Sequence, residues 1–294
     1  MYFKKFLHAT ILLVLLLTCF GTVYASDFDE SINFGDNTDL ISIESEGSFS
    51  DSKLLSENNP GSFKELSDEI GKVESGGTLN LTRNYVYSSG DSPVVIDKKI
   101  TINGNGFKID DSKSSQILKC YGDEKFFNNV VFQDASSRND GGAIYSESKM
   151  TFNGCVFKGI TIPDDYHCGI VIYSTAEVIL ERCNFTNNKA VDYADSPYLV
   201  YSDYIVVKNS RFFDNIAGGI VFGRNLTVID SDFFNNGATP IDSIHAQYRI
   251  AKNIYIKNSN FIGNSILPSA GVGFSSAVFV HSLDSLSNVS LEDC

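Results

Sequence analysis

Acidic and histidine side chains are the residues of this chain whose types could support hydrolytic chemistry. Asp164 and Asp165 are adjacent, and His167 follows two residues later. Hydrolysis of a glycosidic bond needs two positioned carboxyl groups, one protonated to serve the leaving oxygen and one ionised to activate water. The Asp-Asp pair lacks the further units that would complete such a site. We therefore expect these three residues to form a solvated loop, and we expect no catalytic residue.

Metal-binding patterns are also missing from the sequence. His245 and His281 are each isolated from a Cys, a second His or a carboxylate at metal-ligand spacing. Calcium-dependent cleavage of a polysaccharide would need several acidic ligands and an Arg base, and neither Arg211 nor Arg224 has a matching acidic cluster. The sequence predicts no metal site and no cofactor.

Aromatic and acidic residues lie together in the segment 191–198. It contains Tyr193, Asp195 and Tyr198. Tyr beside carboxylates can stack on sugars while accepting hydrogen bonds from their hydroxyl groups. These three residues are candidate glycan contacts. The alternative is that both tyrosines pack against neighbouring strands.

Four N-glycosylation sequons begin at Asn80, Asn184, Asn225 and Asn288. In each sequon the Asn immediately precedes an apolar residue that we expect to point inward, so the Asn should face solvent. The alternative is that an Asn-rich repeat generates such triplets by chance.

Five copies of one pattern must position these residues. The pattern reads apolar-x-apolar-x-x-(Ser or Cys)-x-Phe-x-x-(usually Asn) and returns every roughly 21–28 residues. Residues two apart point to one side of a strand. The apolar pair and the small-Phe pair are an odd number of residues apart, so the chain must bend between them. The small residue and the Phe are Cys155 and Phe157, Cys183 and Phe185, Ser210 and Phe212, Ser231 and Phe233, and Ser259 and Phe261.

A second bend is predicted three residues after the Phe, where Asn188, Asn215, Asn236 and Asn264 lie. Asn tolerates the left-handed backbone conformation, and its amide can bond to an identical amide in the next layer. A third inward-facing segment precedes the pattern at 142–145, 169–173, 199–201 and 219–222.

Three inward faces per turn define a parallel β-helix, whose successive turns stack about 4.8 Å apart. The general preference for right-handed crossovers gives the hand. We therefore predict an all-β, right-handed parallel β-helix. An antiparallel sandwich also has short strands and frequent turns, but it gives no reason to keep Ser or Cys two residues before Phe in five copies.

Cysteines occupy the small-residue position in two consecutive copies. Cys155 and Cys183 should therefore lie close enough for a disulfide bridge. Since Ser210, Ser231 and Ser259 fill the same position, a requirement for small volume is the simpler explanation. Cys120 and Cys168 cannot be paired from the sequence.

The N-terminal part divides into three segments. Residues 1–25 resemble a secretory signal peptide: two lysines precede an apolar run, and small residues lie before Ser26. Residues 26–60 are rich in Ser, Asp, Glu and Asn, which predicts a disordered acidic spacer. Residues 61–77 begin with a capping box at Ser62 and Glu65 and should form a short amphipathic helix that covers the first turn of the stack.

The β-helix is expected over residues 78–294. Val289, Leu291 and Cys294 begin a further copy of the pattern that lacks its Phe, which suggests that the β-helix is incomplete at its C-terminal end. The 294 residues carry a net charge of −13, so binding of nucleic acid through a basic face is not expected. Membrane contact is expected only through the signal segment or a missing C-terminal anchor.

The Gly-Gly-Ala-Ile at 141–144 and the Phe-x-x-Asn units resemble the repeats of polymorphic outer membrane proteins. Residues 62–294 as a whole are similar to the adhesin-like β-helix proteins of methanogenic archaea. The resemblance implies a secreted or cell-surface β-helix used for attachment. The chain departs from the family pattern because Gly-Gly-Ala-Ile is intact only once, and because no translocating barrel or wall-binding module is recognised in the sequence.

We expect a binding and display function with a glycan or protein ligand at the cell surface. The alternative is a carbohydrate-active enzyme similar to pectate lyases or polygalacturonases, which use the same fold. A structural spacer of the cell envelope is a third possibility.

Overall fold

The computed structural model describes residues 59–163, 169–190, 198–242, 252–265, 278–279 and 288–294. The chain divides into two units, Met1–Ser48 and Phe49–Cys294, and all described residues lie in the second. The predicted signal peptide, most of the predicted spacer and several candidate residues lie outside the described residues. These candidates are Asp164, Asp165, His167, Cys168, Tyr193, Asp195, His245 and His281.

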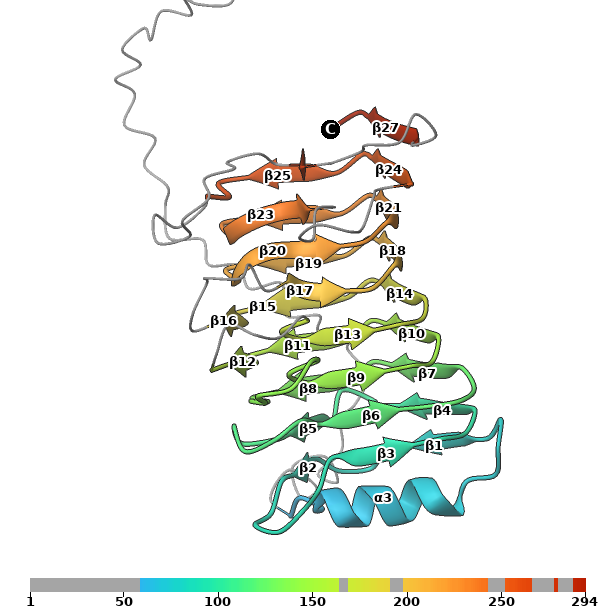
Figure 1. The fold of residues 1–294 in the computed structure, drawn as a ribbon. Helices are drawn as coiled ribbons and strands as arrows, with labels where there is room; N and C mark the ends of the chain where they lie inside the picture. The colour runs from blue at the N-terminus through green and yellow to red at the C-terminus, as the bar shows by residue number, and fades with distance from the viewer. Residues whose placement is uncertain (1–58, 164–168, 191–197, 243–251, 266–277, 280–287) are drawn as a thin grey trace, which may run out of the picture. The chain divides into compact units, whose positions relative to one another are not determined.

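One helix lies across the N-terminal end of the strands (Figure 1), and it is α3 (Phe63–Lys72). The Ser62 hydroxyl accepts a hydrogen bond from the Glu65 backbone N–H, and the Glu65 carboxylate accepts one from the Ser62 N–H. This confirms the predicted capping box. Phe63, Leu66 and Ile70 are buried on the face that packs against the first strands. The helix therefore covers the apolar interior of the first turn.

The strands form three parallel sheets, which we call sheets I, II and III. Sheet I runs in the order β1 (Thr78–Asn80), β4 (Ile100–Asn103), β7 (Lys125–Asn128), β10 (Met150–Asn153), β14 (Val178–Glu181), β18 (Tyr204–Lys208), β21 (Asn225–Ile229), β24 (Asn253–Lys257) and β27 (Asn288–Glu292). Sheet II runs in the order β2 (Tyr85–Val86), β5 (Lys108–Asp110), β8 (Val131–Gln133), β11 (Val156–Lys158), β15 (Asn184–Thr186), β19 (Arg211–Phe213), β22 (Asp232–Phe234) and β25 (Asn260–Ile262).

Sheet III contains two continuous strands, β20 (Ile216–Phe222) and β23 (Gly237–Asp242), beside turns in which the same side is split into two strands. It also includes β3 (Val94–Ile96), β6 (Leu118–Cys120), β9 (Ile144–Ser146), β13 (Ile172–Ser174), β17 (Tyr198–Tyr201), β12 (Thr161–Ile162), β16 (Lys189–Ala190) and β26 (Val278–Phe279). The seven-residue strand β20 pairs with both β16 and β17, which residues 191–197 separate in the sequence. A turn of the β-helix with more residues therefore carries its additional residues within sheet III, between two short strands.

The strands of successive turns stack in register (Figure 1), so equivalent side chains lie in columns along the stack. Phe157, Phe185, Phe212, Phe233 and Phe261 are direct register partners in sheet II. Their rings stack with centroid distances of 4.5–5.1 Å. Phe132 of β8 joins the same column, and the first four of the named five are fully buried. This confirms the predicted right-handed parallel β-helix with three faces per turn.

The corners use left-handed residues, but the second corner differs from our prediction. The first bend has Gly154, Arg182, Asn209, Asp230 or Asn258 at positive φ. The second bend has its positive φ two residues after the Phe, one residue before the position where Asn was predicted: Gly159, Asn187, Asp214, Asn235 and Gly263. Residue 160 in the first of these turns is Ile. The prediction of left-handed geometry at the Asn itself was wrong, because the Asn side chain must point inward and its neighbour makes the turn.

The inward asparagines form an amide ladder. The Asn188 Nδ2 donates to the Asn215 Oδ1 at 2.9 Å, and the Asn215 Nδ2 donates to the Asn236 Oδ1 at 2.9 Å. The Asn236 Nδ2 donates to the Asn264 Oδ1 at 2.8 Å. Asn188 and Asn215 have no exposed surface. Each amide also bonds to backbone groups, so the buried polar atoms of the corner are satisfied.

The small-residue position has a structural reason beyond volume. The Ser210 and Ser231 hydroxyls each accept a hydrogen bond from the backbone N–H of the preceding turn, at 3.0 and 3.2 Å. Cys155 and Cys183 occupy the same position as buried free thiols, and burial raises the pKa of the Cys183 thiol well above its ordinary value. The structure therefore agrees with the simpler of the two explanations, a small buried side chain.

Sheet III is formed by the segments predicted to precede each copy of the pattern. Its aromatic residues, however, point outward. Ile144, Ile172, Val200 and Val221 fill the interior, whereas Tyr145, Tyr173, Tyr201 and Phe222 form the adjacent outer column. Consecutive rings in this outer column are parallel within 4–11°. The inward assignment of the aromatic end of these segments is corrected, because successive residues of a strand alternate between its two faces.

Candidate ligand-binding face

The outer surface of sheet II changes character along one column of register partners. The column runs through Asp110, Gln133, Lys158, Thr186, Phe213, Phe234 and Ile262. Its first members are polar and its last three are apolar. We call Phe213, Phe234 and Ile262 the apolar patch. Ile262 is 65% exposed, and both phenylalanines are half-buried.

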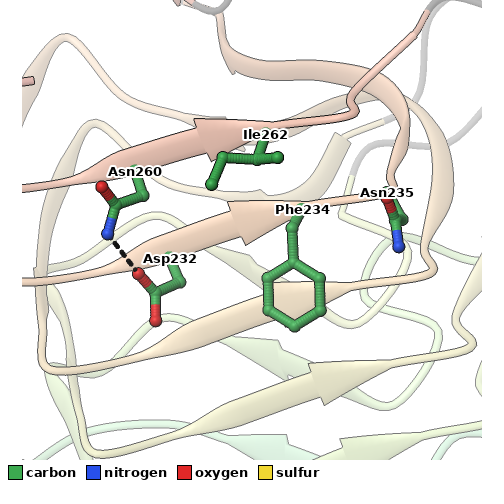
Figure 2. Close-up of a pocket in the computed structure, with 5 residues that line it drawn as sticks. All are labelled: Asp232, Phe234, Asn235, Asn260 and Ile262. Carbon is green, nitrogen blue, oxygen red and sulfur yellow. Dashed lines mark hydrogen bonds between the residues drawn. The ribbon is translucent and has the colours of Figure 1, made fainter. Parts of the chain in front are cut away.

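The two rings of the apolar patch lie parallel. The Phe213 and Phe234 centroids are 5.2 Å apart, and the ring planes differ by 5°. Figure 2 shows the Phe234 ring broadside, with Ile262 next to it. The spacing follows from the parallel register, since each turn of the stack supplies one side chain.

Polar side chains flank the apolar patch at the other end of the same strands. The Asn260 Nδ2 donates to the Asp232 Oδ1 at 2.8 Å, and the Arg211 Nε lies 3.4 Å from the Asp232 Oδ2. Figure 2 shows Asp232 and Asn260 side by side, across from Phe234 and Ile262. The site thus places amide, carboxylate and guanidinium groups beside apolar side chains.

A shallow pocket lies within this arrangement. It has a volume of about 340 Å³ and is lined by Asp232, Phe234, Asn235, Asn260 and Ile262. A volume of this order lies at the lower end of the range for small-molecule sites. The pocket is therefore large enough only for a small group at the surface of sheet II.

Tyr198 lies away from this pocket, in sheet III. It is 2% exposed and packs against Tyr201 and Phe222, whose centroids lie 6.1 and 4.8 Å from its own. This burial matches the alternative in which Tyr198 packs against neighbouring strands. Tyr193 and Asp195, the other candidate glycan contacts, lie outside the described residues.

Carboxylates gather at a corner near the ends of β5 and β8. The Gln133 Nε2 donates to the Asp110 Oδ2 at 3.1 Å and to the Asp134 Oδ2 at 2.7 Å, and Lys108 lies 3.3 Å from Asp110. Asp111 has no exposed surface, and its Oδ2 accepts backbone N–H bonds from Ser114 and Ser115. Burial raises the pKa of Asp111 to about 6. This carboxyl group holds a loop and is closed to a polymer ligand.

The sequon asparagines lie on outer surfaces, as predicted. Asn80 and Asn288 are exposed, and Asn184 and Asn225 are partly buried. Asn80 accepts a hydrogen bond from Asn103 at 2.9 Å, and Asn225 accepts one from Asn253 at 2.9 Å. Three of the four therefore belong to or adjoin amide ladders on sheet I, since Asn288 also donates to Asn253. Their glycosylation remains a prediction.

Groups of three or more His, Cys, Asp or Glu side chains suited to a metal ion are not found among the described residues. In the same part of the chain, no helix combines the length and the apolar character needed to cross a bilayer. Arg211 and Arg224 are both described, and Arg211 pairs with Asp232.

The sequence model of a family described as "Right handed beta helix region" matches residues 121–294. This chain belongs to the right-handed β-helix family. No match was found among curated proteins or solved structures. The match covers the β-helix from the turn containing β7 onward, including the three strands β19, β22 and β25 that carry the apolar patch.

The apolar patch of this β-helix was missed in the sequence, although a signal was present. The doublets Phe212-Phe213 and Phe233-Phe234 place one ring inside and one outside, because adjacent strand residues point to opposite faces. The residue after the Phe varies between copies, so the repeat pattern does not include it: Lys158, Thr186, Phe213, Phe234 and Ile262. An apolar residue at that position in consecutive copies indicates an apolar patch on the outer face of the sheet.

Proposed function

We propose that this β-helix is a secreted or cell-surface, adhesin-like protein that attaches to an extracellular ligand through side chains on its outer faces. The observation that supports the proposal is the register of the sheets, which aligns outward side chains in columns. A stack of paired strands is rigid, so it can hold such columns in fixed positions for a large ligand. The ligand is a glycan or a cell-surface protein.

A binding assay with the purified chain tests this proposal. Immobilised protein should retain soluble polysaccharides or the surface of cells, and the retained polymer should keep its length. Release of reducing or unsaturated sugar ends would instead favour the alternative, a carbohydrate-active enzyme. Envelope defects in a deletion strain, without any retained ligand, would favour a structural spacer.

Export of the chain is a separate part of the proposal. The predicted signal peptide ends at Ala25. We expect the protein recovered from the medium or the cell surface of its host to begin at Ser26, as read by N-terminal sequencing. Recovery of the intact Met1 terminus from the cytoplasm would contradict export.

A further inference from the structure

The apolar patch is an addition to the outer surface that stacking of the turns does not need. Gln133, Lys158 and Thr186 occupy the same column in earlier turns, where the strands pair in the same register. An outward Phe, Phe and Ile in three consecutive turns leaves apolar area in water, with Ile262 65% exposed. Since exposed apolar clusters mark interaction sites, the patch needs a partner.

The polar groups beside the patch restrict the chemistry of that partner. Asp232 is already paired with Arg211 and Asn260, so its charge is compensated. These side chains still present lone pairs and N–H groups, which suit hydroxyl groups that both donate and accept. Carbohydrate recognition combines such planar polar groups with aromatic rings that pack against the apolar face of a pyranose.

Charge argues against acidic polymers. Beside the patch, Arg211 pairs with Asp232 and Asn260 is uncharged, so these side chains offer no unpaired positive charge to an acidic polymer. A polyuronate would leave its own charges without partners at this site. An uncharged chain of sugars would not.

The arrangement of the apolar patch along the stack indicates how a sugar chain would be oriented on it. One side chain of the patch comes from each turn, and the two rings are 5.2 Å apart. This repeat is comparable to the length of one pyranose unit in an extended β-linked chain. A ligand that lies along the stack can therefore place successive sugars on Phe213, Phe234 and Ile262.

We propose that the apolar patch, with Arg211, Asp232 and Asn260 beside it, binds an uncharged, extended hexose or pentose chain that lies along the stack. This inference rests on the proposed attachment function and names its ligand class and its site. It assigns the contact to sheet II, apart from the tyrosines of the segment 191–198.

The test uses the purified chain and isothermal titration with cellohexaose, xylohexaose, mannohexaose and hexagalacturonate. We expect at least one neutral hexamer to bind, and Phe234→Ala to weaken that binding by about tenfold or more, since a central aromatic contact often dominates an interface. The matched control is Phe126→Ala, which removes an outward phenylalanine from sheet I. That variant should bind within about twofold of the original chain. Circular dichroism verifies that both variants are folded.

Other outcomes would overturn the inference. If none of the three neutral hexamers binds, or if both variants bind equally well, the patch is not a neutral-glycan site. Preferential binding of hexagalacturonate would reject the charge argument. A dimer in light scattering that Phe234→Ala dissociates would show that a second copy covers the patch. In each case, retention of another ligand by the Phe234→Ala variant would leave the proposed attachment function intact.

Discussion

A buried amide in this β-helix must satisfy several neighbours at once. Asn215 donates to Asn236 and to the Phe185 carbonyl, and its Oδ1 accepts from the Asn188 side chain and backbone. Loss of this one side chain leaves polar groups of two turns without partners. A buried unpaired polar group costs more than the net gain from a hydrogen bond.

We therefore predict that Asn215→Ala lowers the free energy of unfolding by about 2–4 kcal/mol, because several buried groups lose their partners together. Urea unfolding measures the change. The control is Asn253→Ala in the exposed amide ladder of sheet I, which should cost within about 1 kcal/mol because water replaces the lost bonds. Equal losses in the two variants would contradict the role of burial.

A second residue gives a pH dependence. Burial raises the pKa of Asp111 from its ordinary 3.8 to about 6 in the folded protein. The folded state then binds more protons than the unfolded state between these two values, so this group favours folding at low pH and loses that contribution as pH rises through about 6. A shift of about two units corresponds to roughly 3 kcal/mol.

Asp111→Asn should remove this contribution. The free energy of unfolding of the variant minus that of the original chain should rise by roughly 2–3 kcal/mol as pH increases from 4 to 7.5. Urea unfolding at both pH values measures the difference, with the exposed Asp123→Asn as a control. An unchanged difference between the original chain and Asp111→Asn at the two pH values would show that Asp111 does not titrate as described.

At the scale of elements, helix α3 closes one end of the interior. Leu66 is fully buried at the centre of its apolar face. Leu66→Asp should lower stability by roughly 3 kcal/mol or more, because it places a charge in an apolar contact. The thermal midpoint should fall and light scattering should reveal association through the uncovered turn. Lys72→Gln on the exposed side of the same helix should change neither measurement.

The sequence predicted the elements unevenly. The helix and the turns from β10 onward were identified because the capping box and the Ser/Cys-x-Phe pattern are local signals. The turn with β7 and β8 was missed because Val130 fills the small-residue position and Lys125 replaces an apolar residue. Lys125 is nevertheless buried, and its Nζ donates to the Tyr121 carbonyl at 2.7 Å. A long side chain can thus bury its stem while its charged end reaches a polar partner.

The apolar patch is visible in the sequence only when the residue after each Phe is compared between copies. A repeat pattern records the residue types that successive turns share. The apolar patch instead lies at a position where the residue type changes from turn to turn. Its members come from three turns, so only the register brings Phe213, Phe234 and Ile262 together. The outward position of Tyr173 and Tyr201 follows from the inward position of the residue before each of them, Ile172 and Val200. Successive strand residues point to opposite faces, and the sequence interpretation did not apply this rule to these segments.

At the scale of the whole β-helix, the three sides of a turn differ in how strictly their length is fixed. The inner residue of sheet I and the Phe of sheet II are five positions apart in six turns, as in Leu180 and Phe185 or Val228 and Phe233. In sheet III, β20 spans without interruption what β16 and β17 cover as two pieces. A gene for such a protein can gain or lose codons at that interruption while the aromatic interior keeps its register. Variation among descendants should therefore concentrate on one edge of the stack, where new recognition segments can arise without the framework being rebuilt.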